Sequence, residues 1–175
     1  MAKISAYTDV GTLASGDKIP VVDVSATPPA AGTTKYTTPA ELLTLTGTWT
    51  PYTPTLTNIT QGDGTLDFEY IQIGKLAIVH GQFIMGSTSS ISGVLGFSLP
   101  VTATAVAGLE FHGTILDSGT TRFMAMMVMA TTTRLDVYAS LASGTYVSQT
   151  PTSSTVPMTW TTSDAVEFYI MYEAA

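Results

Sequence analysis

The sequence predicts an all-β protein: an antiparallel β-sandwich or jelly-roll-like domain preceded by an extended N-terminal arm with one short helix. Apolar segments of about four to ten residues recur after residue 48, and clusters of Gly, Ser, Thr and Pro separate them. These segments are rich in Thr, Val, Ile, Phe and Tyr, whose side chains suit a pleated sheet. The first 47 residues contain no Phe or Trp, so they have little with which to build a core. We therefore expect an arm over residues 1–47 and one domain over residues 48–175.

Length, charge and cysteine content exclude several classes of protein. A chain of 175 residues accommodates one ordinary domain and an arm. With 6 basic and 13 acidic residues, the chain cannot form the basic surface that a nucleic-acid partner requires. The absence of cysteine excludes disulfides, thiolate metal sites and cysteine nucleophiles. Apolar runs are too short for membrane insertion, and residues 1–10 lack a secretory signal, so we expect synthesis in the cytoplasm.

The arm carries two local signals of secondary structure. Thr38 and Glu41 have the spacing of a capping box, and Pro39 suits the first position of a helix. A short helix is expected over residues 39–45, ending before Gly47. Residues 18–24 read as a strand, and Pro20 within it favours an edge position.

The domain is expected to contain eight strands, joined in part by hairpins. Gly74 and the run 62–64 supply turn residues beside the longest segments. The expected strands lie near residues 54–59, 65–73, 75–85, 94–99, 106–116, 122–130, 134–140 and 165–173.

Two of these segments, residues 76–85 and 123–130, are apolar on both faces. A sheet exposed on one side alternates between apolar and polar residues, so both faces of these strands need a cover. The cover is either another copy of the chain or, alternatively, the loops or the arm. The expected oligomer interface comprises Ile78, His80, Phe83, Phe123, Met124, Met126, Met127 and Met129.

No pattern for catalysis or metal binding emerges. His80 and His112 have no partner at metal-ligand spacing and are expected to be structural. Asp63, Thr65, Asp67 and Glu69 form an alternating, oxygen-rich run. Calcium binding or a carboxylate pair for glycoside hydrolysis could use it, but a solvent-facing strand explains it more simply. Nucleophile elbows and phosphate-binding loops are absent. We therefore predict a protein that is not an enzyme, with no catalytic residue, no metal and no cofactor.

A platform for stacking sugar rings is an alternative use of the aromatic residues, although such residues more often close a sandwich or lie in an interface. The expected rim of that platform is a long exposed loop over residues 143–157. The candidate aromatic residues are Trp49, Tyr52, Tyr138, Tyr146 and Trp160.

Several motifs resemble those of tailed-bacteriophage virion proteins and together cover most of the chain. The arm resembles the N-terminal segment of such proteins, and the remainder resembles the β-rich domain attached to it. The motifs in the arm are residues 15–24 (SGDKIPVVDV), 32–35 (GTTK) and 38–42 (TPAEL). Those in the domain are residues 49–51 (WTP), 64–65 (GT), 70–75 (YIQIGK) and 96–100 (GFSLP).

The resemblance implies a homotrimeric or otherwise oligomeric structural protein, anchored to phage capsid or tail proteins by its arm and located in the virion. Since no heptad stalk or shaft repeat is present, a capsid decoration (cement) or short head-fibre protein is favoured over a long tail fibre. The alternative is a tail-fibre or receptor-binding protein for host attachment, with a host surface glycan as partner. The expected particle-attachment residues are Ile19, Val21, Val22, Val24, Pro39, Leu42, Leu43 and Leu45.

Overall fold

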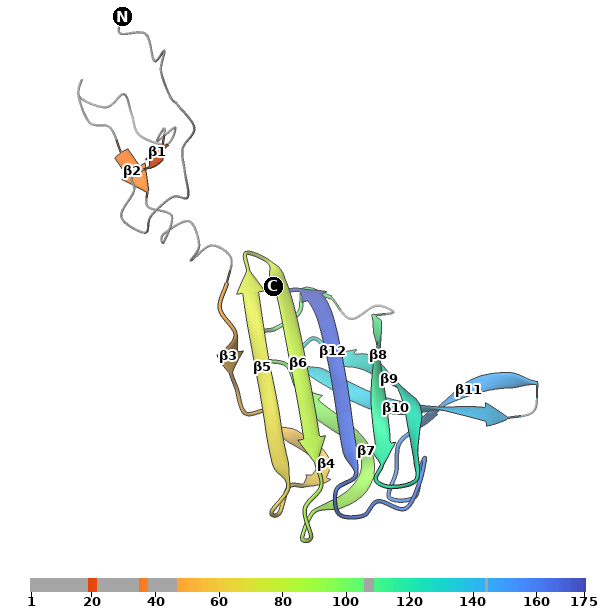
Figure 1. The fold of residues 1–175 in the computed structure, drawn as a ribbon. Helices are drawn as coiled ribbons and strands as arrows, with labels where there is room; N and C mark the ends of the chain where they lie inside the picture. Colours follow the sequence, from red (N-terminus) through yellow and green to blue (C-terminus); the bar gives the residue numbers. More distant parts are fainter. Residues whose placement is uncertain (1–18, 22–34, 38–46, 106–108, 144) are drawn as a thin grey trace, which may run out of the picture. The chain divides into compact units, whose positions relative to one another are not determined.

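The computed structural model describes residues 19–21, 35–37, 47–105, 109–143 and 145–175, and within these ranges it contains strands, turns and loops but no helix (Figure 1). The chain divides into two units, Met1–Gly47 and Thr48–Ala175. In the first unit, β1 (Ile19–Val21) pairs with β2 (Lys35–Thr37) in an antiparallel sheet of two strands. Both strands of such a sheet are edges, which is where proline is tolerated.

Most of the expectations for the arm fall outside the described residues. Ile19 and Val21 lie in β1. The expected helix over residues 39–45 lies outside, as do the attachment residues Val22, Val24, Pro39, Leu42, Leu43 and Leu45.

The second unit is one antiparallel sheet of ten strands. Its path runs β3-β5-β6-β12-β8-β9-β10-β7-β4, and β11 pairs with β10 beside this path. Strands adjacent in sequence form the hairpins β5–β6, β8–β9, β9–β10 and β10–β11, whereas β12 inserts between β6 and β8. The strands are β3 (Thr50–Pro51), β4 (Leu56–Thr60), β5 (Thr65–Ile73), β6 (Leu76–Ile84), β7 (Ser90–Ser98), β8 (Glu110–Asp117), β9 (Thr121–Thr131), β10 (Arg134–Ser143), β11 (Tyr146–Pro151) and β12 (Ala165–Glu173).

The sheet curls so that its two halves enclose one core. Phe68 on β5 and Phe97 on β7 belong to strands far apart in the sheet, yet their ring centroids are 5.2 Å apart. Phe168 on β12 completes the group, with its ring centroid 5.8 Å from each of the other two. All three rings are buried. The result is a sandwich-like fold in which one continuous sheet supplies both layers.

Gly81 on β6 leaves the space that two of these rings occupy. A Cβ atom at this position would lie 2.4 Å from Phe168 and 2.7 Å from Phe68, well inside van der Waals contact. Because both rings are themselves buried, neither can move aside cheaply. The absence of a side chain here is therefore what lets the aromatic group pack against β6.

Two buried polar side chains tie loops to the sheet. The hydroxyl of Thr152 donates to the carbonyl of Val137 at 2.8 Å and accepts from the amide of Leu95 at 3.0 Å. The carboxylate of Asp164 accepts from the amides of Ser118, at 2.9 Å, and Thr161, at 2.6 Å. Buried polar groups cost little only when they are paired in this way.

The prediction of an all-β antiparallel domain is confirmed, and each of the eight expected strands has a counterpart. The expected exposed loop over residues 143–157 is wrong in part, because Tyr146–Pro151 forms β11. Only its first two residues, Tyr146 and Val147, are large and apolar, so the segment lacked the longer apolar run that marked the other strands, and pairing with β10 supplies its hydrogen bonds.

Candidate functional site

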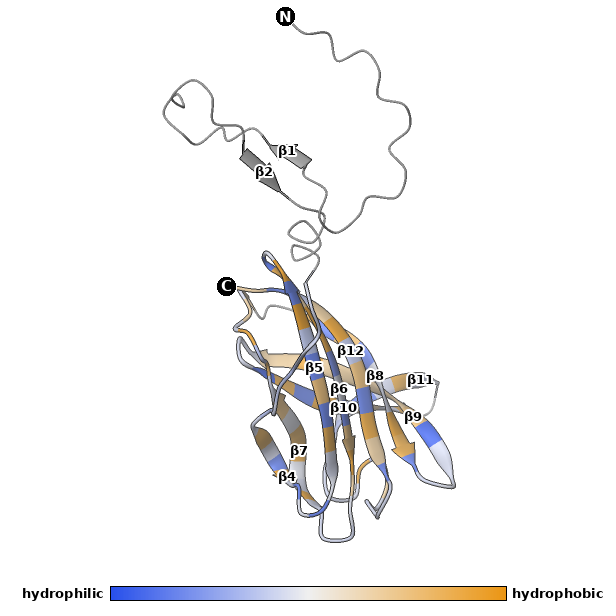
Figure 2. Cartoon of the chain, turned by 60° about the vertical axis from the view of Figure 1, so that its left-hand side comes forward, coloured by the Kyte–Doolittle hydropathy of each residue, from blue (hydrophilic) through white to orange (hydrophobic). Residues whose placement is uncertain are grey.

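The strands β5, β6, β12, β8 and β9 carry apolar side chains on both faces. One face contributes buried residues such as Val79, Met127 and Ile170 to the core. We call the opposite side the outer face. Hydrophobic residues recur along β12 and β8 in Figure 2. The apolar members of the outer face are Ile71, Ile73, Leu76, Ile78, Ile84, Leu116, Met124, Met126, Val128, Tyr169 and Met171.

Three of these side chains are largely exposed to solvent. Tyr169 is 65% exposed, and Met171 and Met124 are each 60% exposed. On neighbouring strands, Met171 lies opposite Ile78, which in turn lies opposite Ile71. The exposed residues therefore belong to a continuous apolar surface, of the kind that marks an interaction site.

The structure divides the predicted interface residues between the two faces. Ile78, His80, Met124 and Met126 lie on the outer face. The rest of the prediction is wrong, because these residues point inward and contribute to or pack against the core of the same chain. They are Phe83, Phe123, Met127 and Met129.

The physical reason is the period of a strand. Successive side chains point to opposite faces, so a run that is apolar throughout contributes only every second residue to each face. The predicted interface also lacks Tyr169 and Met171, which the structure exposes on the outer face. Their signal was present, since Phe168, Ile170 and Tyr172 alternate with them in one strand and fill the core.

A groove opens on the outer face where β12 and β8 separate. The two strands pair only from Ala165–Leu116 to Phe168–Gly113. Beyond this point lies a hollow of about 460 Å³, whose apolar walls include Ile78, Phe111 and Met171. We call this hollow the β12–β8 groove.

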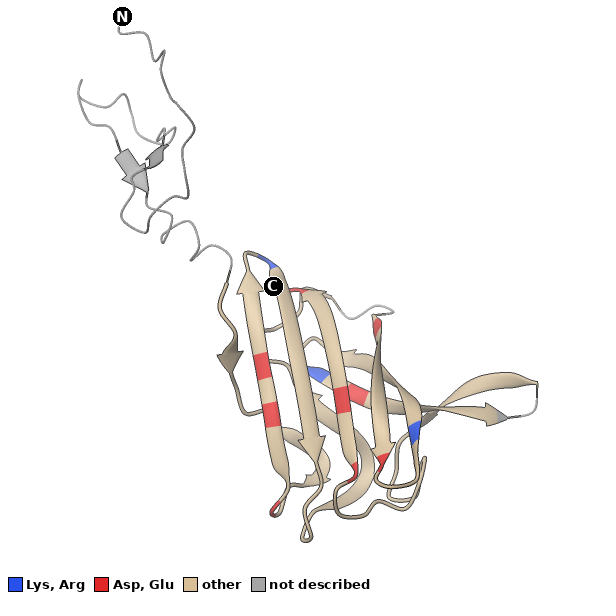
Figure 3. Cartoon of the chain, in the orientation of Figure 1, with Lys and Arg blue, Asp and Glu red and all other residues tan. Residues whose placement is uncertain are grey.

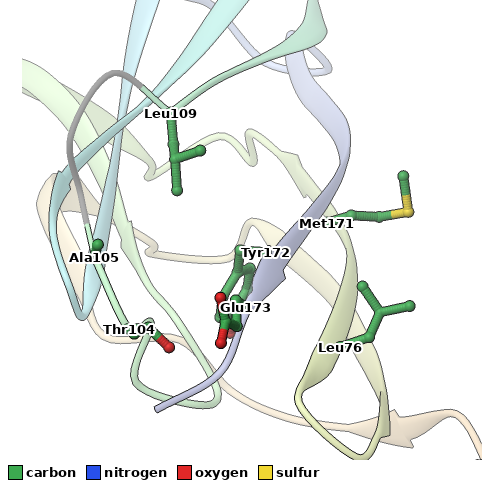
Figure 4. Close-up of a pocket in the computed structure, with 7 residues that line it drawn as sticks. All are labelled: Leu76, Thr104, Ala105, Leu109, Met171, Tyr172 and Glu173. Carbon is green, nitrogen blue, oxygen red and sulfur yellow. The ribbon is translucent and has the colours of Figure 1, made fainter.

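A second hollow, of about 500 Å³, adjoins the β12–β8 groove through the shared residue Met171. In Figure 4, Met171 and Leu76 lie beside each other on neighbouring strands, with Leu109 on the opposite side. The two hollows together extend the apolar surface along β12.

His80 stacks on Tyr169 at the other end of the groove. Their ring centroids are 4.5 Å apart and the planes are inclined by 21°. Glu69 lies opposite His80 on β5. His80, His112 and Tyr169 also line a shallow hollow of about 360 Å³ together with Glu167.

The oxygen-rich run of β5 is explained by strand geometry and a turn. Thr65, Asp67 and Glu69 occupy alternate positions of β5. Asp63, in the preceding turn, accepts hydrogen bonds from the amide of Thr88 at 2.7 Å and the hydroxyl of Ser87 at 2.7 Å. These bonds, chiefly that from the Thr88 amide, hold the pKa of the Asp63 carboxyl well below its usual value. In the part of the chain that the structure describes, no group of three or more His, Asp or Glu side chains is placed to hold a metal ion.

The aromatic residues considered for sugar stacking have separate roles. Tyr52 packs edge-to-face on Phe68 and Tyr70, and burial raises the pKa of its phenol. Trp160 donates its indole N–H to the carbonyl of Ser153 at 2.8 Å and packs against the core.

The other candidate aromatics lie elsewhere. Trp49 is exposed near β3, Tyr138 is half-buried on β10, and Tyr146 is exposed on β11. The structure gives no common platform to this set.

Tyr172 anchors the final strand from the inner face. Its hydroxyl donates to the carbonyl of Val101 at 2.8 Å, and burial raises the pKa of its phenol to about 12. Together with the amide of Thr104, which donates to the carbonyl of Glu173 at 2.8 Å, this contact holds the end of β12 in place below the adjoining hollow.

No match to this chain was found among protein-family models, curated proteins or solved structures. Within the described ranges there is no helix with the length and hydrophobicity that crossing a membrane requires.

Proposed function

We propose that this chain is a non-enzymatic structural protein of a tailed-bacteriophage particle. In this proposal it is a homotrimeric capsid decoration (cement) or short head-fibre protein, anchored to capsid or tail proteins through residues 1–47. The observation that carries the self-association is the exposed apolar outer face, with Tyr169, Met171 and Met124 at its most exposed points. The resemblance of the arm and domain motifs supports the phage assignment, and the division of the chain after Gly47 supports separate roles for the arm and the domain.

Association through the outer face has a clear driving force. Burying a large exposed apolar side chain contributes about 1.5–3 kcal/mol. Association also costs translational and rotational entropy, so several such residues of one subunit must be buried in the same contact. The contiguous arrangement of Ile71, Ile78 and Met171 provides such a cluster.

The first test is the absolute mass of the full chain in solution, measured by light scattering on a sizing column. We expect three times the chain mass of 18.4 kDa. The matched variants are Met171→Ser on the outer face and Thr120→Ser, in the exposed turn between β8 and β9. Met171→Ser should lower the mass at a concentration where Thr120→Ser does not, and a monomeric wild-type chain would overturn the proposed self-association.

Attachment to the particle is tested by removing residues 1–47 from the chain in a phage that encodes it. The shortened chain should be lost from purified particles, as measured by quantitative mass spectrometry, while the full chain is retained. Incorporation of the shortened chain at the full amount would contradict anchoring by the arm.

A second function, recognition of host surface glycans by a tail-fibre or receptor-binding protein, has one specific observation in its favour. The exposed ring of Tyr169, stacked on His80 beside Glu167, combines an aromatic surface with a hydrogen-bond acceptor for sugar hydroxyls. Binding of the intact oligomer to a glycan array, lost in Tyr169→Ser, would support this function. Absence of binding to the array and to host cells would contradict it.

A further inference from the structure

The hairpin of β10 and β11 projects beyond the rest of the sheet, as Figure 1 shows. β9 pairs with β10 only as far as Ala125–Ala139, and from Ser140 onward β10 pairs with β11 alone. We call the described residues 140–143 and 145–149 the ribbon. An isolated ribbon of two strands is marginally stable in water, so one that carries apolar residues gains from a partner.

The end of the ribbon presents two large apolar side chains to solvent. Tyr146 is 80% exposed and Val147 is 71% exposed, the highest values among the large hydrophobic residues that the structure describes as exposed. No charged residue occurs between Asp136 and Asp164, and the ribbon in Figure 3 accordingly shows none. The ribbon can therefore enter an apolar site without burying a charge.

The charges of the outer face limit what can cover it. The carboxylates of the outer face outnumber its cations. Two of these carboxylates form ion pairs: Glu167 with Arg122 and Glu173 with Lys75, each with 3.7 Å between nitrogen and oxygen. Two outer faces packed symmetrically on each other would bring the same carboxylates together, at an electrostatic cost. An uncharged occupant avoids that cost. The outer-face carboxylates are Asp67, Glu69, Glu110, Glu167 and Glu173.

The β12–β8 groove has the chemistry to receive the end of the ribbon. Ile78, Phe111 and Met171 supply apolar walls, and Glu110 and His112 line it as well. A tyrosine suits such a site, because its ring fills apolar space while its hydroxyl donates to an acceptor such as a carboxylate.

We propose that the end of the ribbon of one copy enters the β12–β8 groove of the next copy, with Tyr146 facing one wall and Val147, on the opposite face of the ribbon, facing the other. The contact is head-to-tail, because each subunit offers a ribbon on one side and a groove on another, and such contacts generate closed rings when the rotation closes. A ring of three matches the proposed homotrimer. This inference rests on the proposed self-association and specifies its geometry.

The test uses engineered cysteines, for which the chain is a clean background because it contains none. Tyr146→Cys and Met171→Cys are made in separate, differently tagged full-length chains, co-expressed, and treated with a short bis-maleimide. We expect a covalent dimer that contains one chain of each tag, and no covalent dimer when either variant is present alone. Thr120→Cys replaces Tyr146→Cys in the control and should not cross-link to Met171→Cys.

Other patterns would overturn the head-to-tail contact. Cross-linking of Met171→Cys alone would indicate that outer faces pack on each other, and cross-linking of Tyr146→Cys alone would indicate a contact between ribbons. The mass of the wild-type chain separates the two proposals. A wild-type oligomer without the mixed cross-link contradicts only this inference, whereas a wild-type monomer contradicts the self-association as well.

A second measurement does not depend on cross-linking. The double substitution Tyr146→Ser, Val147→Ser should weaken association at least tenfold, as measured by sedimentation equilibrium. Ser148→Ala, on the same exposed strand, is the matched control and should leave association unchanged. Because the substituted side chains are exposed in the single chain, thermal unfolding followed by circular dichroism should show that the strands still form. Unchanged association of the double variant would overturn the inference.

Discussion

The two faces of β12 have similar side chains and opposite environments. Phe168, Ile170 and Tyr172 are buried against strands from the other half of the curled sheet. Tyr169 and Met171, which alternate with them, face solvent. Hydrophobicity alone therefore does not decide burial in this domain, because the direction in which the sheet curls selects one of two apolar faces as the core.

The largest difference between the faces is expected from truncating one residue on each. Phe168→Ala should lower the free energy of unfolding by about 3–5 kcal/mol, because it leaves a cavity among the three central rings. Met171→Ala, three residues away on the outer face, should change the stability of a single subunit by no more than about 0.5 kcal/mol. Chemical denaturation over a range of protein concentrations separates the change in subunit stability from any change in association. Equal losses of stability for the two variants at low protein concentration would contradict the assignment of the faces.

The next largest effect is expected from adding volume to the inner face. Gly81→Ala should cost about 1–3 kcal/mol, because its Cβ atom would collide with the buried rings of Phe168 and Phe68. Gly74, in the β5–β6 turn, is the control: it has open space around it and a φ of 59°, which asparagine tolerates. Thermal unfolding should show a larger drop in Tm for Gly81→Ala than for Gly74→Asn. The reverse order would mean that the core rings can rearrange to accommodate a methyl group on β6.

Removing a hydroxyl inside the core should lower the free energy of unfolding more than removing one at the surface. Thr152→Val should cost about 1–3 kcal/mol, because it removes the hydroxyl that accepts from the buried amide of Leu95. Thr159→Val, at an exposed position in the same loop, should cost little. Denaturation in urea checks both, and comparable losses would indicate that the Leu95 amide finds another partner.

The smallest effect is expected at the exposed turn beside β5, and it should depend on pH. The pKa of Asp63 is lowered in the folded chain, so its contribution to stability is present above the ordinary value of 3.8 and is lost as the pH falls below it. The Tm of the wild type should therefore exceed that of Asp63→Asn at neutral pH and approach it in acid. Thr88→Val, which removes one of the hydroxyl donors, should give a smaller difference with the same dependence on pH. A difference that grows on acidification would contradict this account.

Local patterns in the sequence predicted much of the fold. Alternation and turn residues located the long strands, and Gly74 marked the β5–β6 hairpin. Pairing between distant segments was not predictable in the same way, because it depends on contacts that no local pattern encodes. The position of β12 between β6 and β8 and the pairing of the short strand β11 with β10 are of this kind.

By itself, the sequence determined the fold class and the presence of apolar residues on both sides of β6 and β9, because strand propensity and the period of two are local properties. Only the tertiary structure decided which side became the core. The sheet closes through contacts such as that between Phe68 and Phe97, which join segments distant in the chain. That closure buried Phe83, Met127 and Met129 and left Tyr169 and Met171 exposed, and it placed an apolar groove and a projecting, uncharged ribbon on the same domain.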